Sequence, residues 1–213
     1  MAITFKNVTG KAKKSSAEAY TYKEGDNTVR MVGDILPRYV YWTTTTDNKR
    51  VPMECLAFDR EQERFANLEK DWVQHHFPEM KCSWAYAVQV VDEGKLKVLN
   101  LKKKLFEQIL TAAEDLGDPT DPVTGWDVRF KKVKTGPLPF NVEYTLQVLK
   151  CKVRELSEDE KTAVEALKPI DEIIRRPSAD DQKTFIEQNI LEGGSTEVPS
   201  EVAEEVKRSE ERR

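Results

Sequence analysis

Hydrophobic and polar residues alternate along much of the first 155 residues, and a period of two is typical of strands that bury one face. The clearest case is 81–91, where Trp84, Tyr86 and Val88 fall on one face. The segment 38–46 is dense in aromatic and β-branched residues, which favour strands. The pattern predicts strands at 28–32, 38–46, 51–56, 81–91, 95–103, 126–133 and 141–153.

Other segments have the spacing or the end signals of helices. An amphipathic pattern with apolar residues recurring at three and four is ended by Gly117; its members are Leu105, Phe106, Ile109, Leu110 and Ala113. Ser157 precedes three acidic residues, which is typical of a helix start. The expected helices lie at 65–77, 105–117, 157–167 and 180–190.

These elements predict a mainly β fold with added helices. One helix among six or so short strands indicates a small Greek-key barrel, and the OB-fold, a five-stranded and partly open barrel with a binding face, fits this pattern. C-terminal helices follow the barrel. The predicted divisions are a basic N-terminal arm at 1–25, an OB-fold core at 26–155, acidic C-terminal helices at 156–190 and a flexible tail at 191–213.

Charge is distributed unevenly along the 213 residues, although the net charge is only −4. Residues 1–155 carry 25 Lys/Arg and 22 Asp/Glu, a net of +3, whereas residues 156–213 carry 9 and 16, a net of −7. Two interpretations of the acidic C-terminal segment are open. It is a solvated helix and tail, or the basic body binds a polyanion and the acidic segment competes with that polyanion for the same surface. The apolar runs are short, so we expect neither a membrane span nor a secretory signal. The three cysteines are scattered, so we expect the protein to reside in a reducing cell interior.

Aromatic and basic residues are interleaved in four clusters on or beside the expected strands. Single-stranded nucleic acid offers a phosphate chain and exposed base faces, so a groove of cations and flat rings binds it without reading its sequence. Salt weakens such binding because each phosphate contact releases counterions. The candidate nucleic-acid-binding residues are Arg38, Tyr39, Tyr41, Lys81, Trp84, Tyr86, Lys102, Lys103, Lys104, Arg129, Phe130, Lys131, Lys132 and Lys134.

The alternative is that many of these rings form an ordinary barrel core. Each strand gives one face to the core, so about half of the aromatic residues are expected to be buried. Tyr39 and Tyr41 lie on the face opposite Val40 and Trp42. If Val40 and Trp42 are core residues, the two tyrosines face outward and are available for stacking.

Two further groups contain residue types that bind metals. The first is Cys55, His75, His76 and Cys82. It has no Cys-x-x-Cys pair, so we expect no zinc. The second is Asp118, Asp121 and Asp127 with Glu114 and Asp115. Its two Asp-Pro steps favour a turn over a nuclease site. With no phosphate-binding loop and no nucleophile motif, neither an enzyme nor a cofactor is expected.

Three blocks carry a family resemblance in combination. They are 81–88 (KCSWAYAV), 97–106 (KVLNLKKKLF) and 125–132 (GWDVRFKK). Together they resemble the single-stranded DNA-binding replication proteins of T4-like and related tailed bacteriophages, over about residues 28–155. The resemblance implies an OB-fold core with a basic, aromatic cleft for single-stranded DNA. The positions that it implies for first tests are Trp84, Lys102, Lys103, Arg129, Lys131 and Tyr144.

The resemblance extends weakly to both ends of the chain. The family has a basic N-terminal arm for cooperative binding, so contacts between copies along the strand are expected at Lys11, Lys13, Lys14, Ser15 and Ser16. The family also has an acidic tail that recruits replication proteins, whereas residues 195–213 here hold six acids and four bases. The best-known member binds zinc through one His and three Cys, and that set is incomplete here.

The sequence therefore predicts a non-enzymatic protein that binds single-stranded DNA without sequence preference. Its expected role is phage DNA replication, recombination or repair, in the cytoplasm of an infected bacterial host and away from membranes. One rival is an OB-fold protein-interaction module, such as a replication or recombination mediator, that acts through its acidic C-terminal helices. The other rival is a magnesium-dependent nuclease that uses the three aspartates of the Asp-Pro loop.

Overall fold

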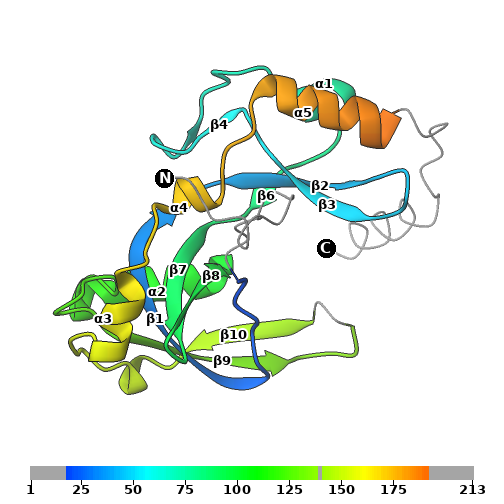
Figure 1. Ribbon diagram of the computed structural model, residues 1–213. Coiled ribbons are helices and arrows are strands. Elements are labelled where there is room, and N and C mark those ends of the chain that lie inside the picture. Colours follow the sequence, from blue (N-terminus) through cyan, green and yellow to red (C-terminus); the bar gives the residue numbers. More distant parts are fainter. Residues whose placement is uncertain (1–17, 139–140, 192–213) are drawn as a thin grey trace, which may run out of the picture.

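The computed structural model describes residues 18–138 and 141–191, and its largest element is a five-stranded antiparallel sheet in the order β10-β9-β1-β7-β8 (Figure 1). The strands are β1 (Gly25–Leu36), β7 (Ala87–Asp92), β8 (Lys95–Asn100), β9 (Asp127–Lys134) and β10 (Val142–Leu146). The predicted fold class is confirmed: a mainly β protein with added helices, consistent with an OB-fold.

The order of the elements explains how distant strands meet. β1 pairs with both β7 and β9, while β7–β8 and β9–β10 are hairpins of consecutive strands. The helix α2 (Lys103–Leu116) connects β8 to β9 and buries Leu105, Phe106 and Ile109 in the barrel core. The helical spacing of apolar residues therefore predicted this helix and most of the face that it buries, although Leu110 of the same pattern is exposed.

A β-bulge interrupts β1 within the segment that pairs with β7. The register shifts between Val32 and Ile35. Gly33 lies at φ +69°, and a Cβ there would be 3.1 Å from Leu167 Cδ2. Glycine satisfies both demands, because it adopts positive φ without strain and leaves room for the leucine. A bulge also increases the local twist of the strand.

Residues 18–22 run along the free edge of β8. Tyr20 N donates to Val98 O and Val98 N donates to Glu18 O, both at 2.8 Å. The segment therefore covers backbone groups of β8 that β10 does not pair with. The predicted arm at 1–25 thus overlaps the barrel from Glu18 onward.

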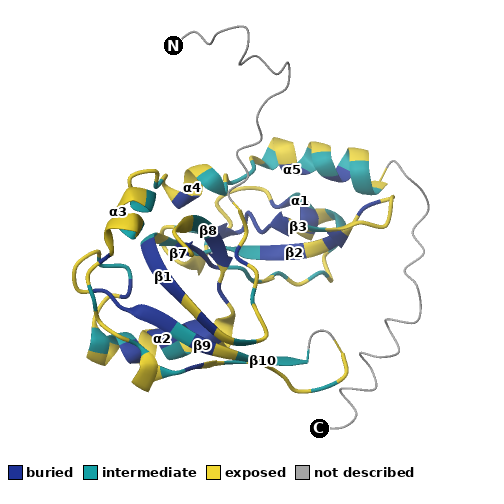
Figure 2. Ribbon diagram, turned by 60° about the horizontal axis from the view of Figure 1, so that its bottom comes forward, coloured by how far each residue is buried: buried dark blue, intermediate teal, exposed yellow. Residues whose placement is uncertain are grey.

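Figure 2 shows that buried residues follow the strands of the barrel. Its fully buried side chains include Val29, Met31, Val88, Val90, Leu99, Trp126, Val128 and Phe130. All six residues of β7 are buried, so this strand lacks the expected alternation. The reason lies in the C-terminal segments over its outer face: Ala87 packs with Ile170, and Gln89 Nε2 donates to Lys168 O at 2.6 Å.

Between β1 and β7 the chain forms an inserted unit, residues 37–86, which we call the insert. It contains β2 (Tyr39–Thr44), β3 (Arg50–Glu54), β4 (Phe58–Asp59), β5 (Arg64–Phe65), α1 (Trp72–His76) and β6 (Ser83–Trp84). The sheet order is β3-β2-β6, with β4 and β5 as a separate pair. Tyr41, Met53, Cys55 and Val73 form its core, apart from that of the barrel.

Three predicted elements differ from the structure. The helix predicted at 65–77 is restricted to α1, because Phe65 pairs with Phe58 across β4 and β5. The strand predicted at 81–91 is two strands, since Ala85 N turns away to bond Arg38 O. The strand predicted at 141–153 ends at Leu146 and is followed by the 3-10 turn η2 (Val148–Lys150).

The chain continues in α3 (Glu158–Val164), α4 (Ile170–Ile173), α5 (Ala179–Ile186) and the π-helical turn η3 (Glu187–Leu191). The predicted N-cap at Ser157 is present as a capping box with Glu160. Ile186 is fully buried in the core of the insert, and Gln182 Oε1 accepts from Trp72 N at 2.6 Å. The end of the described chain is therefore built into the insert. None of the described helices is both long and apolar enough to cross a membrane.

Candidate nucleic-acid interface

Six aromatic residues form a continuous group that begins in the insert. Trp84 stacks on Tyr86 with 3.6 Å between ring centroids and 13° between planes. Tyr39 lies edge-on or tilted against four other rings, at 4.8–6.5 Å. We call this set the insert-side group: Tyr39, Phe58, Phe65, Trp84, Tyr86 and Phe106. Phe65 is its most exposed member, so it offers a ring to solvent.

A second group of rings is centred on Tyr22 of the barrel. The Tyr22 centroid lies 5.6 Å from those of Tyr20 and Phe130, and 4.9 Å from that of Tyr144. We call these four residues the barrel-side group. Burial raises the pKa of Tyr20 to about 12 and raises that of Tyr22 further. Both phenols therefore stay neutral at physiological pH and add no negative charge that would repel phosphate.

Arg38 and Asn100 connect the two aromatic groups. Arg38 Nε donates to Ala85 O at 2.9 Å, and its Nη2 donates to Asn100 Oδ1 at 3.2 Å. Tyr22 Oη donates to the backbone O of Asn100 at 2.8 Å. Arginine, amide and tyrosine thus form one polar bridge, and Ala85 lies between the two stacked rings of the insert side in sequence.

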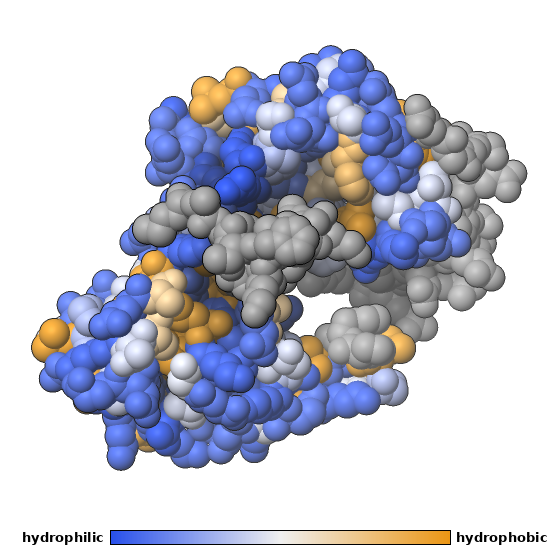
Figure 3. Space-filling model, viewed as in Figure 1, coloured by the Kyte–Doolittle hydropathy of each residue, from blue (hydrophilic) through white to orange (hydrophobic). Residues whose placement is uncertain are grey.

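The molecule is hollowed between two of its parts. Figure 3 shows a deep indentation between the part that holds β2, β3 and α5 and the part that holds β9 and β10. The insert-side group belongs largely to the first part, and Phe130 and Tyr144 belong to the second. We call the space between the two groups the trough.

The lysine run at the start of α2 is divided among three environments. Lys102 Nζ lies 5.6 Å from the centroid of Tyr22, at the trough. Lys103 Nζ lies 3.9 Å from Glu107 Oε1, and Lys104 lines a separate groove with Val148. The first turn of α2 contains no acidic residue. Cations at a helix N-terminus oppose the helix dipole, so a bound anion would relieve this local charge.

The basic cluster of β9 is divided between the two faces of the strand. Lys132 pairs across the ladder with Tyr144, and Lys134 pairs with Val142, on the face of the barrel-side rings. Arg129 and Lys131 alternate with them and point to the opposite face. Sequence proximity therefore overstated this cluster, since only half of it is on the side of Tyr22 and Tyr144.

The environments of these cations also differ. Lys132 Nζ pairs with Glu24 Oε1 at 2.9 Å and donates to Tyr22 O at 3.4 Å. Lys81 is exposed and lines a groove with Phe65 in the insert. Among the ion pairs of the described residues, none involves Lys81, Lys102, Lys104, Lys131 or Lys134.

Three aromatic residues predicted to contact DNA are buried. Phe130 is fully buried and Tyr86 is 6% exposed. Tyr41 is 3% exposed, and its hydroxyl contacts Cys55 Sγ at 3.3 Å. The condition under which the two tyrosines would face outward is not met, because Val40 is buried but Trp42 is 47% exposed. The period of two was right, but the face of Tyr41 is covered by α1 and α5, while Trp42 lies on the open side.

Sequence reasoning missed Tyr22, Asn100 and Phe65. Tyr22 fell within the predicted arm, although Tyr20 and Tyr22 already show the alternation of a strand. Asn100 lies inside the block that carried the family resemblance, but no charge or ring marked it. The predicted arm residues Lys11, Lys13, Lys14, Ser15 and Ser16 lie outside the described part of the chain.

The residues considered for metal binding have other contacts. Burial raises the pKa of Cys55 to about 12, which disfavours the thiolate that zinc requires. Asp121 Oδ1 accepts from Val123 N and Thr124 N, and Asp127 pairs with Arg154 at 2.7 Å. In the described ranges, no three His, Cys, Asp or Glu residues are placed to hold an ion. The absence of zinc stays a prediction.

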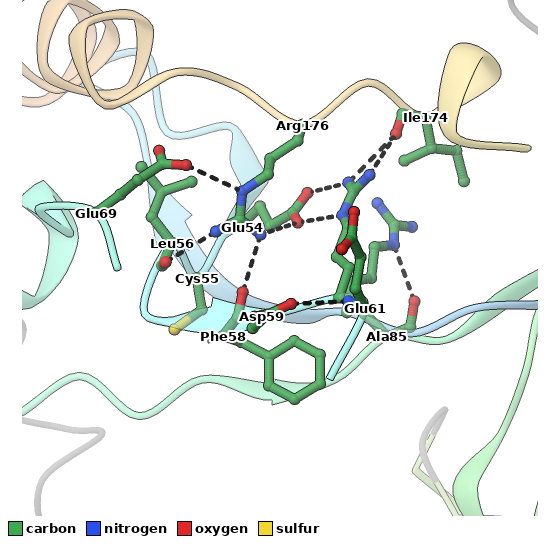
Figure 4. A network of polar contacts seen from close by, with 12 residues as sticks. Glu54, Cys55, Leu56, Phe58, Asp59, Glu61, Glu69, Ala85, Ile174 and Arg176 are labelled. Atoms are coloured by element: carbon green, nitrogen blue, oxygen red, sulfur yellow. Dashed lines mark hydrogen bonds and ion pairs between the residues drawn. The ribbon is translucent and has the colours of Figure 1, made fainter. Parts of the chain in front are cut away.

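Charged residues fasten the C-terminal segment to the insert (Figure 4). Arg60 Nε and Nη2 donate to the two oxygens of Glu54, and Arg60 also donates to Ile174 O at 3.2 Å. Arg176 donates to Leu56 O and Phe58 O at 2.8 and 2.9 Å. This network holds one wall of the trough in place.

Comparisons with known proteins support part of the sequence interpretation. No family model matches the chain. A protein of Escherichia phage T5, named a probable ssDNA-binding protein, is 29% identical over 162 residues, which cover 69% of this chain and 60% of that protein. The chain thus spans about 60% of the relative's length. The likeness is to a phage protein named for single-stranded DNA binding, and it does not point to T4-like phages in particular.

Proposed function

We propose that the chain binds single-stranded DNA with little sequence preference and without catalysis, in the trough between the insert-side and barrel-side aromatic groups. One observation at Tyr22 carries the proposal. The Lys102 ammonium lies 5.6 Å from the centroid of the Tyr22 ring, and the Tyr22 hydroxyl is connected to Arg38 through Asn100. Rings accept stacked bases and cations accept phosphates, which together suit any sequence.

The position of the trough on the barrel supports the proposal. OB-folds bind oligonucleotides on the face of their second and third strands and on two flanking loops. Here β7 and β8 are the corresponding hairpin, the insert replaces the first loop, and the connection between β9 and β10 takes the place of the second. The trough residues Arg38 and Asn100 lie at the same end of this hairpin. The name of the T5 relative agrees with this use of the fold.

The biological setting is a further proposal, because the name of the relative states single-stranded DNA binding in a phage and no role. The proposed role is in phage DNA replication, recombination or repair, in the cytoplasm of an infected bacterial cell, with no cofactor. Contacts between copies through the N-terminal arm, and recruitment of replication proteins through the tail, are further proposals about segments outside the described residues.

The test is a fluorescence titration of the full chain with oligo-dT at two salt concentrations. Affinity should fall steeply with salt, because each phosphate contact with a single strand contributes about −0.7 to the slope of the logarithm of the binding constant against the logarithm of the salt concentration. Lys102→Gln should make this slope shallower by about 0.7. Lys103→Gln is the matched control, because Lys103 already faces Glu107. A salt-independent affinity, or equal effects of the two variants, would contradict the proposal.

The rival function, a protein-interaction module, placed binding on the acidic C-terminal helices. Deletion of 156–213 cannot separate the two functions, because it removes Ile186 from the core of the insert. A cleaner test replaces exposed acids of α3, as in Glu158→Gln with Asp159→Asn. These changes should leave affinity for oligo-dT unchanged if the trough binds DNA, and a protein-interaction module would lose its partner instead.

A further inference from the structure

A cavity opens on the insert beside the trough and belongs to neither aromatic group. Its volume is about 350 Å3, and it lies between the β2–β3 hairpin and α5. Arg38 lines it, and the guanidinium of Arg38 bonds Ala85 O and Asn100 Oδ1 in the trough. The cavity and the trough therefore have the residue Arg38 in common. The other lining residues are Val40, Pro52, Met53, Glu54, Arg175, Pro177, Asp181, Gln182 and Phe185.

The cavity continues into an exposed aromatic surface along the same face of the hairpin. Val40 pairs with Glu54, and Trp42 with Pro52, so these side chains share a face. The Trp42 ring is 47% exposed, and the Arg50 guanidinium lies 5.2 Å from its centroid. At about 3.3 Å per residue, the face from Arg38 to Trp42 extends roughly 13 Å.

The charges on this face favour an anion. Its three arginines are Arg38, Arg50 and Arg175. Of the two carboxylates at the cavity, Glu54 forms ion pairs with Arg60 and Arg176. Asp181 accepts from Ser178 Oγ at 2.8 Å and keeps its negative charge, so the three arginines still outnumber it.

Resting on the proposed function, we propose that this face is a second DNA subsite, in which a strand leaving the trough passes Arg38 and stacks a base on Trp42. The ring has the exposure that stacking needs, and Arg50 adds a cation beside it. The occupant is the continuation of the same single strand, because Arg38 makes the two surfaces contiguous. Short oligonucleotides fill the trough alone, and longer ones reach Trp42.

The experiment compares the full-length protein with its Trp42→Ala variant across oligo-dT lengths from about 4 to about 16 nucleotides, the range of OB-fold site sizes. Loss of one stacked base should weaken binding of the longest oligonucleotides by roughly 5- to 150-fold. The shortest should bind as before. Because Trp42 is half exposed, the thermal midpoint should stay within a few degrees, which checks that the variant is folded.

Arg50→Gln provides a second arm with a matched control. Lys70 Nζ lies 3.6 Å from the centroid of Trp72, so Lys70→Gln removes a cation from another ring of the insert. Of the two variants, only Arg50→Gln should weaken the binding of long oligonucleotides. Equal losses at all lengths, or no loss with Trp42→Ala, would overturn the subsite while leaving the trough intact. Failure of the unaltered protein to bind any length would instead overturn the proposed function.

Discussion

The barrel and the insert are stabilised in different ways. The barrel core is apolar, with Val29, Val88 and Phe130 packed by regular alternation along neighbouring strands. The insert has its own apolar core around Met53 and Val73, and in addition a buried carboxylate, Glu54, which binds Arg60 of its own loop and Arg176 from more than a hundred residues away. A period of two in the sequence specifies the core of the barrel, whereas nothing local specifies the distant partner of Glu54.

The difference bears on function because the two units supply opposite walls of the trough. The barrel wall is fixed by its core and by the segment 18–22 along β8. The insert wall keeps its position through charges that connect it to α4 and α5. Changes in charge should therefore disturb the insert wall, and changes in ring area should affect both walls.

The largest effect is expected from Glu54→Ala. Its side chain is 6% exposed, and its removal leaves Arg60 and Arg176 buried without their carboxylate. Breaking one partner of a buried ion pair costs about 3–5 kcal/mol. Urea unfolding should show this loss. Glu69→Ala is the control, because Glu69 is 3.8 Å from Arg176 and largely exposed, so it should cost at most about 1 kcal/mol. Equal losses would mean that the network does not hold the insert.

Removing one ring from each wall should weaken DNA binding without unfolding either unit. Tyr22→Ala on the barrel side and Phe65→Ala on the insert side should each cost about 1–3 kcal/mol of binding to oligo-dT. Tyr22→Phe keeps the ring and loses only its bond to Asn100 O, so it should bind more tightly than Tyr22→Ala. If only one of the two alanine variants loses affinity for oligo-dT, DNA does not bind between the two walls.

A smaller effect should appear in the pH dependence of stability where α3 meets the barrel. Hydrogen bonds from Arg154 lower the pKa of Glu160 to about 2. A carboxyl with a lowered pKa stabilises the fold above its unfolded value near 4.5, and this contribution disappears as pH falls toward 2. Glu160→Gln should cost roughly 1–2 kcal/mol at pH 7 after solvent screening. In urea unfolding the cost should shrink below about pH 4.5, and a constant cost would contradict the assignment.

The smallest predicted effect distinguishes the two faces of β9. Lys134 and Lys131 are both exposed but lie on opposite faces of the strand. Lys134→Gln should lower the salt slope of oligo-dT binding by up to about 0.7, because it is on the trough side. Lys131→Gln should leave the slope unchanged. The reverse result would place DNA on the outer face of β9.

The barrel could be predicted from the sequence because its contacts follow local periodicity. The alternation of Trp84, Tyr86 and Val88 and the helical spacing after Leu105 each anticipated a buried face. The Asp-Pro loop was also predicted as a turn, and Asp121 accepts from Val123 N and Thr124 N. These features need only residues that are close in the chain.

The insert and half of the candidate site could not be predicted in this way. The burial of Tyr41 and the exposure of Trp42 depend on Val73 and Ile186, which lie far away in sequence. Asn100 acquires its role only when Arg38 and Tyr22 meet on its two sides. Alternation says which residues share a face, and only the tertiary packing says which face is covered.

The most direct test of the account is ultraviolet cross-linking of the full chain to oligo-dT, with the cross-linked residues identified by mass spectrometry. The account predicts adducts at Tyr22 and Phe65, one on each wall of the trough, and with longer oligonucleotides also at Trp42. Adducts confined to the outer face of β9, around Arg129 and Lys131, would contradict the claim that DNA lies between the barrel and the insert.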